Sequence, residues 1–120
     1  MARKPKVLVV DDERVIADTL AIILNQSGFE ASAVYSGTDA VEQARAQRPE
    51  LVISDVIMDD MNGIEAAINI RQFLPDCKIL LFSGQAATAD LLENARAQGH
   101  EFEILAKPVH PQDLLAKLRG

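Results

Sequence analysis

The chain has 120 residues, a length that corresponds to one domain with room for a buried core. Its hydrophobic share is 48% but its aromatic share only 4%, so Val, Ile, Leu and Ala must build that core, as in α/β proteins. The formal net charge of −6 argues against a duplex-binding surface, which needs clustered Lys and Arg. No apolar run approaches the roughly 18 residues of a membrane span, and a lone Cys77 cannot form an internal disulfide, so we expect a cytoplasmic protein.

Short apolar runs alternate with helical patterns along the chain. The runs recur roughly every 25 residues, the combined length of a strand, a helix and two turns. Gly28 and Gly99 stop the first and fourth helical stretches, and Pro111 starts the last one. In chain order we predict strand 7–10, helix 15–24, strand 29–35, helix 38–47, strand 51–54, helix 64–74, strand 79–82, helix 88–98, strand 102–106 and helix 113–119.

This alternation predicts the fold class, an α/β domain whose doubly wound, five-stranded parallel sheet carries helices on both faces. Runs 7–10, 51–54 and 79–82 are continuously apolar, as expected of strands covered on both faces. Run 29–35 mixes polar residues such as Glu30 with apolar ones. We therefore place this run at an edge of the sheet.

Polar residues follow the predicted strands at the points where the strands end. In strand order these residues are Asp11 and Asp12, Asp55, Ser83, and Lys107. Because loops at the carboxyl ends of parallel strands meet at one rim, we expect these side chains to face the same small volume. Clustered carboxylates without His or Cys suit a hard cation such as Mg²⁺ or Mn²⁺. A carboxylate beside such a cation can attack a phosphoryl group.

Four segments carry a family resemblance: "VLVVDDE", "LVISDVIMDDMNGIE", "LLFSG" and "ILAKP". In order and spacing they resemble the receiver domain of bacterial two-component response regulators. The resemblance covers essentially the whole chain, residues 1–120, as one receiver domain without an output domain. It implies a flavodoxin-like sheet with the strand order 2-1-3-4-5.

The resemblance also implies a role for each polar residue at the rim. Asp55 matches the aspartate that accepts phosphate from a histidine kinase or a phosphotransfer protein. The implied Mg²⁺ ligands are Asp11, Asp12, Asp55 and the backbone carbonyl of Ile57. The implied phosphoryl-binding and switch residues are Ser83, Gly84 and Lys107, and the bond from Lys107 to Pro108 is one that is usually cis in the family.

One position near the implied phosphorylation site differs from the family's pattern, and two others are expected to influence hydrolysis of the phosphorylated aspartate. Asp59 stands where the family usually has Pro, and we interpret the acidic pair at 59–60 as a solvated loop tip rather than as metal ligands. The resemblance implies that the positions of Ile57 and Gln85 shape water access to the acyl phosphate. We expect apolar Ile57 to offer an attacking water little help, whereas Gln85 can orient one.

The aromatic switch residue has two candidates. Many receivers place Tyr or Phe three residues before the lysine, where this chain has Ile104. Phe102 lies two residues earlier and, on a strand, points to the same face. Either Phe102 takes the aromatic role or the switch works without an aromatic residue.

We predict a phosphoacceptor signalling protein that assists its own phosphorylation and dephosphorylation but is not otherwise an enzyme. The alternative is a receiver-like binding module that works without phosphorylation. Loss of Asp12, Asp55 or Lys107 would favour that alternative, and all three are present. A flavin carrier is disfavoured because "DDE" would repel phosphate, and a haloacid-type phosphatase because Ile57 stands where its second acid belongs.

The expected partners are proteins. They are a histidine kinase or phosphotransfer protein, a separate downstream target and, on phosphorylation, a second copy of the chain. We expect no direct contact with nucleic acid and none with a membrane. The expected cofactor is Mg²⁺ or Mn²⁺.

Overall fold

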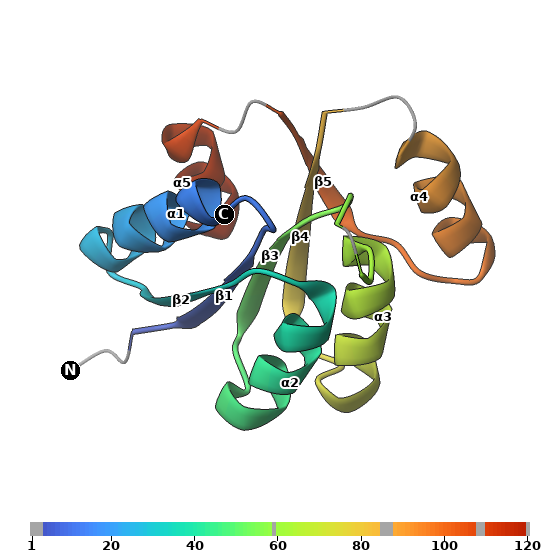
Figure 1. Cartoon of the computed structure of the whole chain (residues 1–120), viewed down its shortest axis with the longest axis horizontal. Coiled ribbons are helices and arrows are strands. Elements are labelled where there is room, and N and C mark those ends of the chain that lie inside the picture. The colour runs from blue at the N-terminus through green and yellow to red at the C-terminus, as the bar shows by residue number, and fades with distance from the viewer. Residues whose placement is uncertain (1–3, 59, 85–87, 108–109, 120) are drawn as a thin grey trace.

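The computed structural model describes residues 4–58, 60–84, 88–107 and 110–119. Within these residues five strands alternate with five helices (Figure 1). The elements are β1 Lys6–Val10, α1 Arg14–Gln26, β2 Glu30–Val34, α2 Gly37–Gln47, β3 Leu51–Asp55, α3 Gly63–Phe73, β4 Lys78–Ser83, α4 Thr88–Ala97, β5 Glu103–Ala106 and α5 Pro111–Arg119. All strands pair in parallel in the order β2-β1-β3-β4-β5. The predicted fold class and strand order are therefore confirmed.

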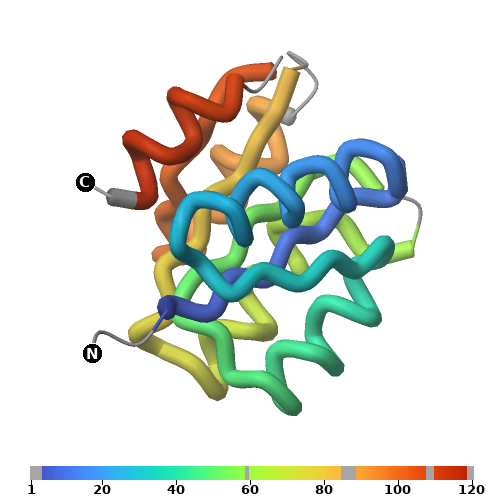
Figure 2. The backbone as a smooth tube through the Cα atoms, turned by 90° about the vertical axis from the view of Figure 1, so that its left-hand side faces the viewer, coloured from blue at the N-terminus to red at the C-terminus, as the bar shows by residue number. Residues whose placement is uncertain are grey.

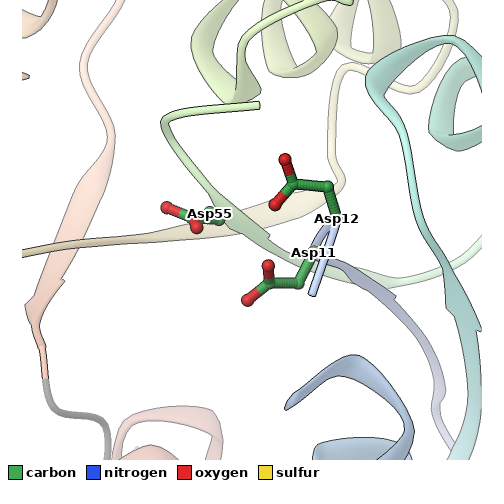
Figure 3. A group of neighbouring side chains, drawn as sticks. All are labelled: Asp11, Asp12 and Asp55. Carbon is green, nitrogen blue, oxygen red and sulfur yellow. The ribbon is translucent and has the colours of Figure 1, made fainter. Parts of the chain in front are cut away.

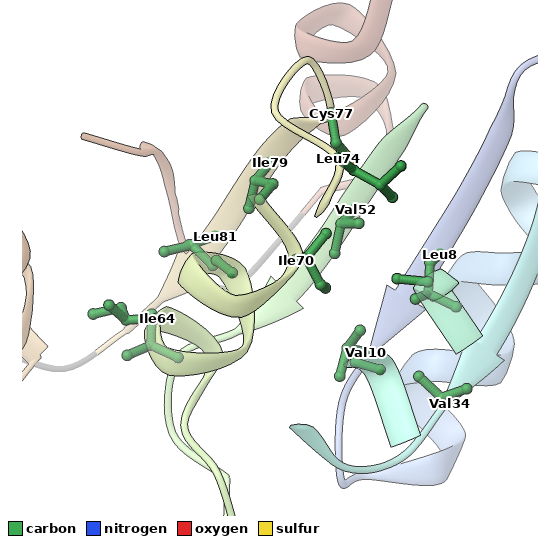
Figure 4. Packing of buried hydrophobic residues seen from close by; sticks show 14 of the residues in the cluster. Leu8, Val10, Val34, Val52, Ile64, Ile70, Leu74, Cys77, Ile79 and Leu81 are labelled. Atoms are coloured by element: carbon green, nitrogen blue, oxygen red, sulfur yellow. The ribbon is translucent and has the colours of Figure 1, made fainter. Parts of the chain in front are cut away.

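Helices cover both faces of this sheet (Figure 1, Figure 2). Side chains of a strand alternate between its faces, so neighbouring residues of β1 enter different cores. Leu8 and Val10 belong to the core beneath α2, α3 and α4, whereas Val9 belongs to the core beneath α1 and α5. Figure 4 shows the first core, in which Ile70 of α3 packs near Val52 of β3. The apolar runs thus hold two helical layers to one sheet.

The central strands are more buried than the edge strands. All five residues of β3 are buried, and so are four of the five in β1. In β2 only Val34 is buried, which confirms the predicted place of this strand at an edge. Strand β5 forms the other edge, and the side chain of Ile104 there is 37% exposed.

The helices begin at local start signals. Ser36 caps α2 by accepting a hydrogen bond from the backbone N–H of Asp39, and Asn62 caps α3 in the same way. Helix α5 begins at Pro111, two residues earlier than predicted, because proline is well suited to the first helical position. None of the described helices has the length and apolar character needed to cross a membrane.

Candidate phosphoacceptor and cation site

The candidate site lies at the carboxyl ends of the parallel strands. Strand β1 ends just before Asp11, and β3 ends on Asp55 itself. Strand β4 ends on Ser83, and Lys107 directly follows β5. Because the four strands are parallel neighbours, their ends bring these residues together from distant parts of the sequence.

Three carboxylates form the acidic half of the site. One oxygen from each of Asp11, Asp12 and Asp55 lies within 4.8 Å of the others. Figure 3 shows the three carboxyl groups pointing into the same space from the ends of β1 and β3. Asp11 and Asp55 are buried, while Asp12 is exposed and gives the cluster a side open to solvent.

Asp11 has one satisfied and one unsatisfied oxygen. Its Oδ1 accepts a hydrogen bond of 2.9 Å from the backbone N–H of Glu13, the N-cap residue of α1. Its Oδ2 is fully buried and has no hydrogen-bond partner among the described residues. Burial raises the pKa of Asp11 to about 6, opposed by the Glu13 N–H and assisted by the negative charge of Asp55. A buried, unpaired oxygen beside two other carboxylates is the donor set that a hard divalent cation fits.

Lys107 forms the basic half of the site. Its Nζ donates a hydrogen bond of 2.8 Å to Oδ2 of Asp55. Burial of the ammonium acts against its charge, but the hydrogen bond and the negative charges of Asp55 and Asp11 outweigh burial, so the pKa of Lys107 is raised. The ammonium is therefore charged at neutral pH and neutralises part of the acidic cluster.

A small cavity of about 280 Å³ adjoins these charged groups. Its lining residues are Asp12, Glu13, Asp55, Ile57, Ser83, Gly84 and Lys107. Gly84 permits the close approach of β4 to the lysine, since a Cβ atom there would lie 2.9 Å from Cβ of Lys107. The cavity therefore has a cationic side at Lys107 and an acidic side at Asp12 and Asp55.

The loop after β3 borders the same cavity. Ile57 is 50% exposed, and its backbone N–H makes a long hydrogen bond of 3.4 Å to Oδ1 of Asp55. Met58, in contrast, is buried in the core beneath α3. The N–H of Ile57 therefore lies beside the phosphoacceptor candidate, and the role of the Ile57 carbonyl as a cation ligand stays a prediction.

Three predicted positions lie outside the described residues. They are Asp59, Gln85 and Pro108. The proposed role of Gln85 in hydrolysis and the expected cis bond from Lys107 to Pro108 therefore stay predictions.

The two switch candidates have different surroundings. The guanidinium of Arg71 lies 4.4 Å from the ring centroid of Phe102, and its Nη1 donates a 2.8 Å hydrogen bond to the carbonyl of Glu101. Phe102 also packs against the core beneath α3 and α4. Ile104 is 37% exposed and shares a small cavity with Phe102 between α4 and β5. The choice between the two residues stays a prediction.

One polar contact near the site did not follow from the sequence. Asp60 accepts hydrogen bonds from the side-chain hydroxyl of Thr38 at 2.6 Å and from its backbone N–H at 3.2 Å. Of the acidic pair at 59–60, which the sequence predicts as a solvated loop tip, only Asp60 is among the described residues, and it is exposed but bound to the start of α2. No sequence spacing connects residues 38 and 60, because the contact depends on how α2 and the loop after β3 approach one another.

The sequence and the fold are similar to those of known proteins. The family model of the response regulator receiver domain matches residues 7–119. "Probable transcriptional regulatory protein TcrX" of Mycobacterium tuberculosis is 32% identical over 114 residues, which are 95% of this chain and 48% of the relative. "DNA-binding response regulator MtrA" of Mycobacterium leprae is 29% identical over 98% of this chain and 51% of the relative. This chain thus spans about half the length of these curated relatives.

A solved structure shows the same fold over nearly the whole of both chains. The chemotaxis protein CheY4 of Vibrio cholerae superposes with a TM-score of 0.86 at 28% identity, covering 98% of each chain. The names of these two curated relatives describe a transcriptional regulator and a DNA-binding response regulator, so the relatives do not support the expectation of no direct contact with nucleic acid. The match to the family model extends over nearly the whole sequence. The chain therefore belongs to the family of response regulator receiver domains of two-component systems.

Proposed function

We propose that this receiver domain accepts a phosphoryl group on Asp55, with Mg²⁺ as cofactor, from a phosphohistidine of a kinase or phosphotransfer protein. The observation that carries the proposal is the pairing of Asp55 with the ammonium of Lys107 at 2.8 Å, beside the carboxylates of Asp11 and Asp12. A nucleophilic carboxylate, a cation-binding group and a fixed positive charge are thus within reach of one cavity.

The reaction is a displacement at phosphorus. An oxygen of Asp55 attacks the phosphorus of the phosphohistidine, the P–N bond breaks, and the imidazole leaves and takes up a proton. The product is an acyl phosphate, and no electrons are transferred to or from another reactant. A bound Mg²⁺ would neutralise phosphoryl oxygens, and its ligands would be Asp11, Asp12, Asp55 and the carbonyl of Ile57.

The basic wall of the cavity would stabilise the transferred group. The ammonium of Lys107 can move its hydrogen bond from Oδ2 of Asp55 to a phosphoryl oxygen without leaving the cavity. Ser83 and Gly84 line the same cavity, so the hydroxyl and a backbone N–H would complete the cradle. Ile57 lines it with an apolar side chain that cannot activate water, and Gln85 would orient a water for later hydrolysis.

The output of the reaction would be a change in protein contacts. Phosphorylation replaces the contact between Asp55 and Lys107, which joins the ends of β3 and β5. We propose that this change reaches the β5 side of the domain through Phe102 or Ile104 and alters binding to a downstream protein or a second copy of the chain. We place this activity in the cytoplasm, where a phosphohistidine donor is available.

Incubation with acetyl phosphate and Mg²⁺, followed by intact-mass measurement, tests the proposal. The native chain is expected to gain the mass of one phosphoryl group, and Asp55→Asn is expected to gain none. Asp76→Asn is the matched control and should be phosphorylated normally. Asp76 is an exposed acid in the turn before β4, at the end of the sheet opposite the candidate site. No adduct on the native chain would favour a receiver-like module that binds without phosphorylation, and an adduct that persists in Asp55→Asn would place the acceptor elsewhere.

A further inference from the structure

The β3–α3 loop, which the structure describes at residues 56–58 and 60–62, is held to helix α2 by the carboxylate of Asp60. Asp60 Oδ2 accepts hydrogen bonds from the hydroxyl of Thr38 at 2.6 Å and from the Thr38 N–H at 3.2 Å. Asp60 Oδ1 accepts a third, from the N–H of Gly37 at 3.2 Å. The hydrogen bond from the Thr38 hydroxyl is the main reason that the pKa of Asp60 falls to about 2. Asp60 is therefore ionised throughout the physiological range, and its charged form accepts the hydrogen bonds from Thr38 and Gly37.

These contacts divide the capping of α2 between two segments of the chain. Ser36 is the local cap and satisfies the N–H of Asp39. The N–H groups of Gly37 and Thr38 are satisfied by Asp60, which lies 23 and 22 residues further along the chain. A helix start whose first amides bind a distant carboxylate joins that distant segment to the helix. Here the joined segment is the loop that carries Ile57.

Close backbone packing supports the same junction. A Cβ atom at Gly37 would collide with the carbonyl oxygen of Met61 and lie 2.8 Å from its Cβ atom. The loop and the first turn of α2 therefore touch along their backbones, in addition to the hydrogen bonds of Asp60. Any movement of the loop away from α2 would break both sets of contacts.

The other end of the loop is also held. The N–H of Gly63 donates a 2.8 Å hydrogen bond to the carbonyl of Val56, and a Cβ atom at Gly63 would collide with the carbonyl of Asp55. Between these two anchors Met58 is buried in the core, so Ile57 is confined on both sides. Within this loop the N–H of Ile57 reaches Oδ1 of Asp55 at 3.4 Å.

From this junction we infer that Asp60 and Thr38 are positioning residues for the cation site: together they hold the β3–α3 loop so that the Ile57 carbonyl can serve as a ligand. The inference rests on the proposed cation-dependent function. Neither residue belongs to the carboxylate cluster that would hold the cation, so their effect on binding would be indirect, through the position of the loop. Loss of the contact should weaken cation binding more than it weakens the fold.

The principal test variant is Thr38→Val, which removes the hydroxyl and leaves every charge in place. Mn²⁺ binding, followed directly by electron paramagnetic resonance without phosphorylation, should weaken about tenfold, as is typical when a residue that orients a metal ligand is lost. Asp60→Asn should show a similar loss together with a salt-dependent part, because it also removes a negative charge near the cation. Hydrogen exchange should show faster opening of the Ile57 amide in both variants.

Ser36→Ala is the matched control, since it removes the other cap of α2 without touching the loop. Its fold should lose stability comparably to Thr38→Val, while its Mn²⁺ affinity and the exchange of its Ile57 amide stay native. Native affinity in Thr38→Val, or an equal loss in Ser36→Ala, would reduce the contact to an ordinary helix cap and overturn the inference. If the native chain binds no Mn²⁺, the proposed cation-dependent function is wrong. If the exchange rate of the Ile57 amide is unchanged in Thr38→Val, the positioning role is wrong, whatever the result for Mn²⁺.

Discussion

The surroundings of Asp11 at the candidate site disfavour its ionised form. Its carboxyl group is fully buried, one of its oxygens has no partner among the described residues, and Asp55 lies beside it. Its pKa in the folded chain is about 6, above the ordinary value of 3.8, so the folded state binds this proton more tightly than the unfolded chain does. Asp11 therefore contributes stability in full below about pH 4, and that contribution is lost as the pH rises through about 6.

Asp11→Asn should remove this pH dependence in the absence of metal. Because one pKa unit corresponds to about 1.4 kcal/mol, the substitution should stabilise the metal-free fold at neutral pH by on the order of 2–3 kcal/mol. Urea denaturation of native and variant chains in EDTA, at several values between about pH 4 and pH 8, measures the difference. Asp12→Asn, at an exposed position, should change stability much less. If the difference in unfolding free energy between the native chain and the variant stays constant with pH, Asp11 is not the source of the pH dependence.

At the scale of elements, the edge strand β2 is partly covered by a side chain. Asn25, near the end of α1, accepts a 2.8 Å hydrogen bond from the N–H of Ala31 and donates one of 3.1 Å to the carbonyl of the same residue. Strand β2 pairs with β1 only, so the outward backbone groups of Ala31 would otherwise be open to another strand. Asn25 imitates a neighbouring strand at one position and makes the edge a poorer template for association.

Asn25→Ala should expose this part of the edge. Losing two hydrogen bonds costs roughly 1–2 kcal/mol, partly offset by the better helix propensity of alanine. The amide of Ala31 should exchange faster, and light scattering at high protein concentration should show more self-association. Gln26→Ala, at the next position of the same helix, is the control and should leave both readouts unchanged. Native exchange at Ala31 in the Asn25 variant would show that the side chain does not protect the edge.

At the scale of the whole molecule, the candidate cation ligands couple distant parts of the chain. The carboxylates come from the ends of β1 and β3, separated by α1, β2 and α2 in the sequence, and they meet only in the folded sheet. The unfolded chain has no such cluster, so a cation that binds the site should stabilise the entire fold. The global melting temperature is therefore a measure of site occupancy.

Mg²⁺ should raise the melting temperature of the native chain. At a concentration one hundred times its Kd, the expected stabilisation is about 2.7 kcal/mol. Thermal unfolding in Mg²⁺ and in EDTA measures the effect, and Asp12→Ala should abolish the rise because it removes one of the three clustered carboxylates. Asp76→Ala, which lies before β4 at the other end of the sheet, should retain the rise in melting temperature. An equal rise in Asp12→Ala and the native chain would mean that Mg²⁺ binds elsewhere.

The sequence by itself determined the architecture and the composition of the site. Apolar runs with the periods of strands and helices predict a parallel α/β sheet, and the carboxyl ends of such strands share one edge. This is why the sequence alone predicts that Asp11, Asp55 and Lys107 lie at one rim. These properties follow from local periodicity and from a general rule of topology, so no knowledge of packing is required.

The tertiary structure decided which polar groups satisfy one another. The bond from Lys107 to Asp55, the unpaired oxygen of Asp11 and the contact of Asp60 with Thr38 depend on approaches of a few ångströms between segments far apart in the chain. An acidic loop residue looks the same in sequence whether it faces solvent or caps a helix. Periodicity defines the face on which a residue lies, but only packing defines its partner, and the partner sets its charge and its role.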